Sequence, residues 1–120
     1  MKVLIAGETW TKHIIHIKGF DSFTTSEYGE GISWFKHAME SGNIDLTHIP
    51  SHQVAEYFPN TLEELKQYDV IIFSDIGSNS ILLPINTFTN GIIQPNRLNL
   101  IKEYVKAGGN FAMIGGYMSF

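Results

Sequence analysis

The chain has 120 residues, of which 43% are hydrophobic and 17% charged, and this describes one globular domain rather than a disordered or fibrous protein. The net charge of −4, with eight scattered Lys and Arg residues, gives no electrostatic basis for binding nucleic acid or an anionic membrane. Cysteine is absent, so these residues contain no disulfide, zinc-thiolate site or cysteine nucleophile.

The first predicted elements are a strand, a long irregular connection and a helix. Residues 2–6 are rich in β-branched side chains and end at Gly7, as a first strand in a doubly wound fold does. Residues 7–26 show no regular period, and a connection of this length is more often functional than incidental. A helix is expected from about Ser26 or Glu27 until Ser41-Gly42-Asn43, where glycine provides a C-terminal cap.

Next, the pattern predicts a strand, two helical segments and a second strand. Residues 44–49 predict a partly exposed strand, and residues 51–58 a short helical turn. A capping box begins the following helix at Thr61-Leu62-Glu63-Glu64, and Tyr68 ends it. The apolar run at residues 69–75 predicts a buried strand.

The last third of the chain repeats the pattern of connection, helix and strand. Residues 76–96 are rich in Ser, Asn, Thr, Gly and Pro and predict a second long irregular stretch. A helix is expected from Pro95 or Asn96 to Ala107-Gly108-Gly109, followed by a strand at residues 111–114.

This order predicts an α/β fold. We expect a flavodoxin-like three-layer sandwich with a parallel sheet of about four strands in the spatial order 2-1-3-4. It would form one domain over residues 1–120, interrupted after the fourth strand because no residues remain for a following helix. Both long connections leave the carboxyl ends of adjacent strands, so they should converge with the turn at Gly115-Gly116, where such folds bind ligands.

Polar and glycine residues in these three segments are the candidate ligand-binding residues. Of these, Glu8, His16 and Asp75 are also the candidates for catalysis. The full set is Gly7, Glu8, Trp10, His16, Asp75, Gly77, Asn79, Gly115, Gly116 and Tyr117.

The sequence predicts no metal and no cofactor. His13 and His16 are three residues apart and could share a metal on a helix, but the segment is not clearly helical. We expect one of them to be buried and hydrogen-bonded and the other solvated. The glycine-rich dinucleotide fingerprint and the phosphate-binding loop are both absent, which disfavours the common modes of nucleotide binding.

Several separated blocks of sequence carry a resemblance to a known family. They are Gly7-Glu8-Thr9-Trp10, residues 16–23, residues 73–79, Pro95-Asn96-Arg97-Leu98, and residues 107–109 with 113–120. The chain resembles the N-terminal half of the glutamine amidotransferase-like proteins, an uncharacterised branch of the class I glutamine amidotransferase-like superfamily.

The resemblance implies a nucleophile elbow of the type Gly-x-Cys-x-Gly after the strand at residues 111–114. Aligning Gly115 with its first glycine places Tyr117 at the cysteine position and Ser119 at the second glycine. A tyrosine has a pKa near 10 and a bulky ring, so it is a poor substitute for a catalytic thiol. The resemblance therefore implies the fold and argues against glutaminase activity.

Three functions remain as alternatives. The preferred one is an amidotransferase-like domain without glutaminase activity that binds a small polar ligand at the carboxyl ends of the strands. The second is a hydrolase of another class that acts on a small polar substrate, so enzymatic activity is left open. The third is an interaction module that forms homo-oligomers through an exposed edge. We expect a cytoplasmic protein that binds neither nucleic acid nor membranes.

Overall fold

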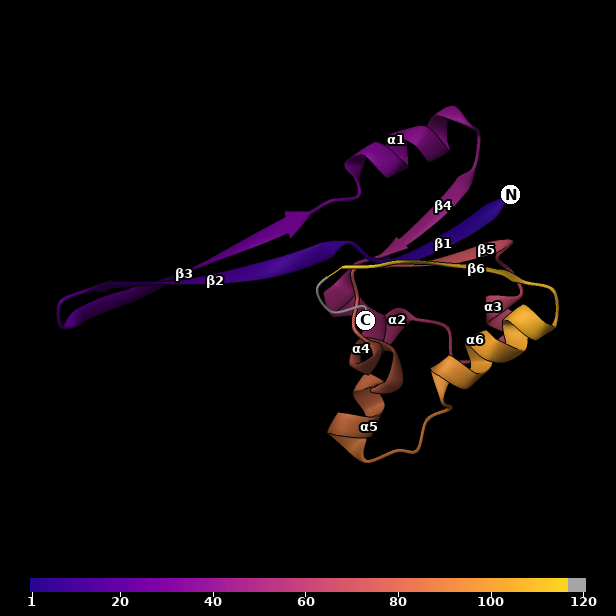
Figure 1. The fold of residues 1–120 in the computed structure, drawn as a ribbon. Helices are drawn as coiled ribbons and strands as arrows, with labels where there is room; N and C mark the ends of the chain where they lie inside the picture. Colours follow the sequence, from indigo (N-terminus) through magenta and orange to yellow (C-terminus); the bar gives the residue numbers. More distant parts are fainter. Residues whose placement is uncertain (117–120) are drawn as a thin grey trace.

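The computed structural model of the chain describes residues 1–116, and it shows an α/β body from which a long β-hairpin projects (Figure 1). Its strands are β1 (Lys2–Gly7), β2 (Thr9–Lys18), β3 (Asp21–Glu30), β4 (Asp45–Ile49), β5 (Val70–Ser74) and β6 (Asn110–Ile114). Its helices are α1 (Ser33–Ser41), α2 (Val54–Tyr57), α3 (Leu62–Leu65), α4 (Ser78–Leu82), α5 (Ile85–Asn90) and α6 (Arg97–Lys106), with a 3-10 turn η1 (Ser51–Gln53) before α2.

Four parallel strands form the central sheet in the order β4-β1-β5-β6. Counted among the parallel strands alone, this is the predicted order of second, first, third and fourth. The α/β fold class is thus confirmed. β6 pairs with β5 on one side, and within residues 1–116 its other edge has no neighbouring strand.

The sheet is covered on both faces, because the side chains of each strand alternate between two cores. In β1, Val3 and Ile5 point to the face covered by α1, where Ile32 completes a small cluster. Leu4 and Ala6 point to the opposite face, where α2, α3 and α6 pack over a larger core (Figure 1). This gives the three layers that the sequence predicts.

The prediction of an irregular connection over residues 7–26 is wrong. These residues form β2 and much of β3, which pair in register from Thr9↔Glu30 to Lys18↔Asp21 around a turn at Gly19 and Phe20. The segment shows no apolar-polar period because nearly all of both strands is solvent-exposed, so neither face is selected for burial. The many Thr and Ile residues of the segment, which favour strands, are the sequence feature that indicates β-structure here.

Two further predictions need correction. The first helix begins at Ser33 rather than near Ser26, since the residues between belong to β3. The stretch 76–96 is not wholly irregular: it contains the short helices α4 and α5, the second of which ends at Gly91 in the left-handed conformation. The capping box of Thr61 and Glu64 is confirmed, although α3 itself ends at Leu65.

Arg97, the first residue of α6, holds three segments together from inside the body. Its side chain is 1% exposed. The guanidinium donates to Asn60 Oδ1 at 2.9 Å and to the backbone carbonyls of Val54 and Ala55, both at 3.2 Å. It also lies 5.8 Å from the ring centroid of Phe58, and burial lowers the pKa of the guanidinium.

Replacing Arg97 with Met should lower the free energy of unfolding by about 2–4 kcal/mol, because one buried and two part-buried acceptors lose their donor. Urea denaturation followed by circular dichroism measures this loss. Lys102→Met is the matched control: Lys102 is exposed on the same helix, and its replacement should change stability by less than about 0.5 kcal/mol. Equal losses in the two variants would contradict this account of Arg97.

Candidate functional site

The carboxyl ends of β1 and β5 both turn through an unusual backbone conformation. Gly7 has φ of 108°, and Glu8, which follows it, has φ of 56°. Asp75, directly after β5, has φ of 46°. Non-glycine residues adopt positive φ rarely, and such residues concentrate at functional sites, where the surrounding contacts hold them in place. Glu8 and Asp75 are two such residues at the ends of neighbouring strands, so this edge of the sheet is the candidate site.

Glu8 and Ser74 connect the two strand ends. The Glu8 backbone N–H donates to the Ser74 carbonyl at 2.7 Å, and the Ser74 hydroxyl donates to Glu8 Oε2. Gly31, which follows β3, donates its N–H to the Glu8 carbonyl at 3.0 Å, and a Cβ on Gly31 would overlap Glu8 Oε1. The backbone and the carboxylate of Glu8 together therefore make the contacts that join β1, β3 and β5.

Asp75 continues this connection toward β6. Its backbone N–H donates to the carbonyl of Ile114 at 3.2 Å, and a Cβ on Gly116 would overlap its Oδ1 atom. That oxygen is buried and has no hydrogen-bond partner within residues 1–116. A buried carboxylate oxygen without a donor is costly, and this oxygen faces Gly116 at the end of β6.

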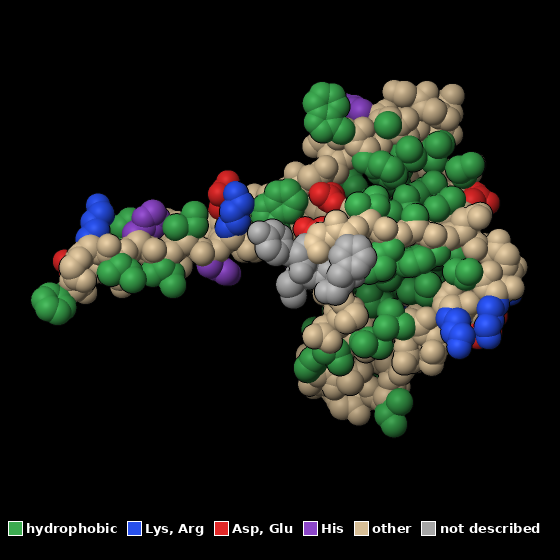
Figure 2. Space-filling view, in the orientation of Figure 1, with side chains coloured by type: hydrophobic (Ala, Val, Ile, Leu, Met, Phe, Trp, Pro, Cys, Tyr) green, Lys and Arg blue, Asp and Glu red, His purple; other side chains and the backbone are tan. Residues whose placement is uncertain are grey.

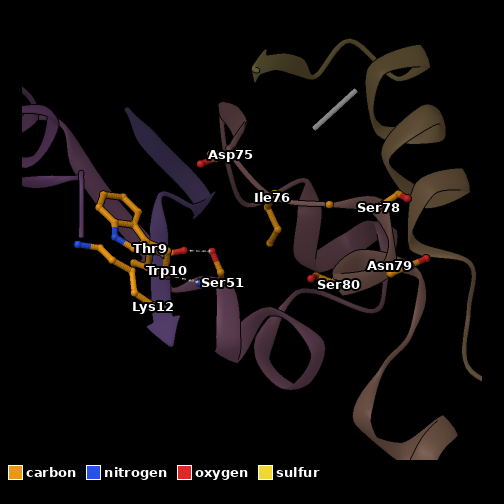
Figure 3. A pocket seen from close by; sticks show the side chains of 10 residues that line it. Thr9, Trp10, Lys12, Ser51, Asp75, Ile76, Ser78, Asn79 and Ser80 are labelled. Atoms are coloured by element: carbon orange, nitrogen blue, oxygen red, sulfur yellow. Dashed lines mark hydrogen bonds between the residues drawn. The ribbon is translucent and has the colours of Figure 1, made fainter. Parts of the chain in front are cut away.

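A pocket of about 760 Å³ opens beside Asp75 at the carboxyl ends of the strands. Trp10 and Lys12, at the base of the hairpin, lie on one side of it, and the start of α4 lies on the other (Figure 3). The Trp10 indole crosses the hairpin over Gly29, where a Cβ would come within 2.5 Å of its Nε1 atom. The lining residues are Thr9, Trp10, Lys12, Ser51, Asp75, Ile76, Gly77, Ser78, Asn79 and Ser80.

Two residues that the sequence did not single out, Ser51 and His48, contact the chain beside this pocket. Ser51 donates its N–H to Thr9 Oγ1 at 2.8 Å, and its hydroxyl donates to the Thr9 carbonyl at 2.9 Å (Figure 3). His48 Nε2 donates to the Gly7 carbonyl at 2.8 Å, which assigns the proton to that nitrogen. No sequence motif marks these two residues. The sequence indicates them only by their position at, or just after, the end of the predicted strand at residues 44–49.

The structure brings most of the predicted site residues together, but not His16. Trp10, Asp75, Gly77 and Asn79 line the pocket. Gly7, Glu8 and Gly116 lie behind it in the contacts described above, and Gly115 is the first residue after β6. Tyr117 lies outside the described residues.

His13 and His16 lie on the projecting hairpin and not at the strand ends. Neither is buried, so the expectation of one buried histidine is wrong. His16 stacks on Phe23 with ring centroids 4.4 Å apart, and His13 Nδ1 lies 2.8 Å from Ser26 Oγ. Side chains three residues apart on a strand point to opposite faces, which separates the two imidazoles. Within residues 1–116 no three His, Asp or Glu side chains gather closely enough to hold a metal ion.

Comparison with known proteins agrees with this architecture. A family model described as "Putative glutamine amidotransferase" matches residues 2–120. The chain belongs to this family. No curated protein matches the chain. The chain's amidotransferase-like fold also occurs in two solved structures, cytoplasmic proteins STM3548 and STM1381 from Salmonella typhimurium, the latter from strain LT2. Each is 52% identical to it, with TM-scores of 0.94 and 0.93.

This amidotransferase-like chain is aligned over its whole length with both Salmonella proteins, but covers 49% of each of them. It thus spans about half the length of the structures it matches. Among the described residues, no helix is long and apolar enough to cross a membrane.

The close packing at the end of β1 predicts that Gly7→Ala destabilises the amidotransferase-like domain. Alanine would combine a φ of 108° with a Cβ that overlaps the Ser74 carbonyl oxygen, so the free energy of unfolding should fall by about 3 kcal/mol or more. Gly91→Ala is the control: its φ is 62° but no heavy atom lies within 4 Å of the added Cβ. Its cost should be about 1–2 kcal/mol. Denaturant unfolding of both variants measures the difference, and a Gly7→Ala variant as stable as Gly91→Ala would contradict the packing.

Proposed function

We propose that this amidotransferase-like domain binds a small polar ligand in the pocket beside Asp75 and does not hydrolyse glutamine. The observation that carries the proposal is the pocket at the carboxyl ends of the strands: Asp75, which has φ of 46°, lines it together with Lys12 and the polar residues at the start of α4. A ligand with an N–H or O–H group would donate a hydrogen bond to the accessible part of the half-buried Asp75 side chain.

The charges around the pocket favour a ligand that carries both an amino and an acidic group. Asp75 and Lys12 both line the pocket, so one negative and one positive side chain border it. Lys12 Nζ lies 3.3 Å from Glu27 Oε2, but both side chains are more than half exposed, so this ion pair is weak and can rearrange. Ser78, Asn79 and Ser80, at the start of α4, add hydroxyl and amide groups to the lining. An amino acid fits this combination of groups.

Two features argue against catalysis by these residues. The 120 residues contain no cysteine to act as the amidotransferase nucleophile. A hydrolase that uses Glu8, His16 and Asp75 together has no support in the geometry, because Glu8 is engaged with Ser74 and His16 lies on the hairpin.

The cellular setting follows from the relatives. Both Salmonella structures are named cytoplasmic proteins, and we propose the same location for this chain. The net charge of −4 supports a small-molecule ligand over nucleic acid or an anionic membrane.

Titration calorimetry with L-glutamine as the probe should show saturable binding to the protein. Asp75→Asn should weaken that binding about tenfold or more, because it removes the carboxylate's charge from the pocket. Asparagine tolerates positive φ about as well as aspartate, so this substitution leaves the backbone of the turn undisturbed. Asp45→Asn is the control: Asp45 is an exposed carboxylate at the start of β4, at the opposite end of the sheet, and its loss should leave binding unchanged. Absence of saturable binding, or equal weakening in both variants, would overturn the proposal.

An ammonia-release assay tests the catalytic half of the proposal. Incubation of the protein with L-glutamine should release no more ammonia than the heat-inactivated protein does, because these residues provide no thiol nucleophile. Release above that background, abolished by Asp75→Asn, would show that the site is catalytic.

A further inference from the structure

The hairpin of β2 and β3, residues 9–30, projects from the body as a free arm (Figure 1). Each strand has ten residues, so the arm extends about 34 Å. It raises the radius of gyration to 16.8 Å, whereas a compact domain of this length has a value of about 14 Å. A two-stranded ribbon is marginally stable on its own in water, so an arm of this length calls for a stabilising partner.

The two faces of the arm differ sharply in charge. Side chains that are directly opposite in an antiparallel pair share a face, which assigns every residue of the arm to one side or the other. Between residues 11 and 28, all of the Lys, Asp and Glu side chains lie on one side, the charged face: Lys12, Lys18, Asp21 and Glu27.

The opposite side, the uncharged face, carries no Lys, Arg, Asp or Glu between residues 11 and 28. It consists of Thr11, His13, Ile15 and Ile17 from β2 and Ser22, Thr24, Ser26 and Tyr28 from β3. Ile15 and Ile17 are 66% and 73% exposed. Figure 2 shows both blue lysine side chains of the arm along one of its long sides, and green side chains without blue along the other.

We propose that the arm is a dimerisation element, in which the uncharged faces of two copies of this chain pack together about a twofold axis. A twofold axis places each surface against an identical surface, so residues near the axis meet their own counterparts. Charged side chains in that position would repel each other, and the uncharged face is the one that avoids this cost. Ile15 and Ile17 of each copy would leave water, which supplies the driving force.

This arrangement is compatible with the ligand pocket. Trp10 and Lys12, which line the pocket, belong to the charged face of the arm. Packing through the opposite face leaves both side chains in place beside Asp75. Thr9, which also lines the pocket, lies on the other side but at the base of the arm, outside residues 11–28. Dimerisation through the uncharged face therefore need not alter ligand binding.

Analytical ultracentrifugation of the protein over a concentration series tests the proposal. Wild type should sediment as a dimer at the higher concentrations. Ile15→Lys and Ile15→Glu should each sediment as a monomer there, because each brings like charges together across the axis. An equimolar mixture of the two should recover the dimer, since opposite charges then meet. A wild-type protein that stays monomeric at every concentration, or a mixture that stays monomeric, would overturn the proposal.

Neighbouring residues on the other face provide matched controls. Ile14 precedes Ile15 on the same strand but lies on the charged face, and Thr25 and Thr24 form the corresponding pair on β3. Ile14→Lys and Thr25→Lys should leave the dimer intact, whereas Thr24→Lys should dissociate it. All of these positions are exposed, so circular dichroism should show the same folded body in every variant. If variants on the two faces dissociate the dimer equally, the interface lies elsewhere and the proposal is contradicted.

Discussion

The Glu8 N–H donates to the Ser74 carbonyl, and the Ser74 hydroxyl donates to the Glu8 carboxylate, so the ends of β1 and β5 are joined through both backbone and side chain. Gly7 makes this possible, because a Cβ there would overlap the Ser74 carbonyl oxygen. The arm begins one residue after Glu8, and Gly31, one residue after the arm, donates back to the Glu8 carbonyl. Both ends of the arm are thus attached to the same residue, and Asp75 beside Ser74 opens onto the pocket.

A single junction therefore carries two different functional surfaces. The charged face of the arm contributes Trp10 and Lys12 to the pocket, while the exposed part of its uncharged face is the surface proposed to meet a second copy. The proposed ligand pocket lies at the base of the ribbon, and the proposed dimer interface lies further along it. The strand ends provide polar groups and backbone positions with positive φ. The 120 residues include no cysteine that could serve as the amidotransferase nucleophile.

The sequence predicts the body of this fold well because burial imposes a pattern there. The strands at residues 2–6 and 69–75 are recognisable since both of their faces are covered, and Asn96 and the Thr61 capping box mark helix starts by local chemistry. The arm was missed for the opposite reason: a ribbon exposed on both sides has no apolar period. His16 lies on that ribbon and not at the strand ends, whereas Asp75 lies at the end of β5, where a residue that directly follows a buried strand is expected. His48 and Ser51 depend on tertiary contacts that no local pattern reveals.

The central claim is that the functional site of this amidotransferase-like domain lies where β1 and β5 end. Hydrogen–deuterium exchange of the protein, with and without saturating L-glutamine, tests it most directly. The account predicts slower exchange at residues 9–12 and 75–80, which line the pocket, and unchanged exchange at residues 56–68, which lie on another surface. Protection confined to residues 56–68, or to any segment away from the strand ends, would contradict it.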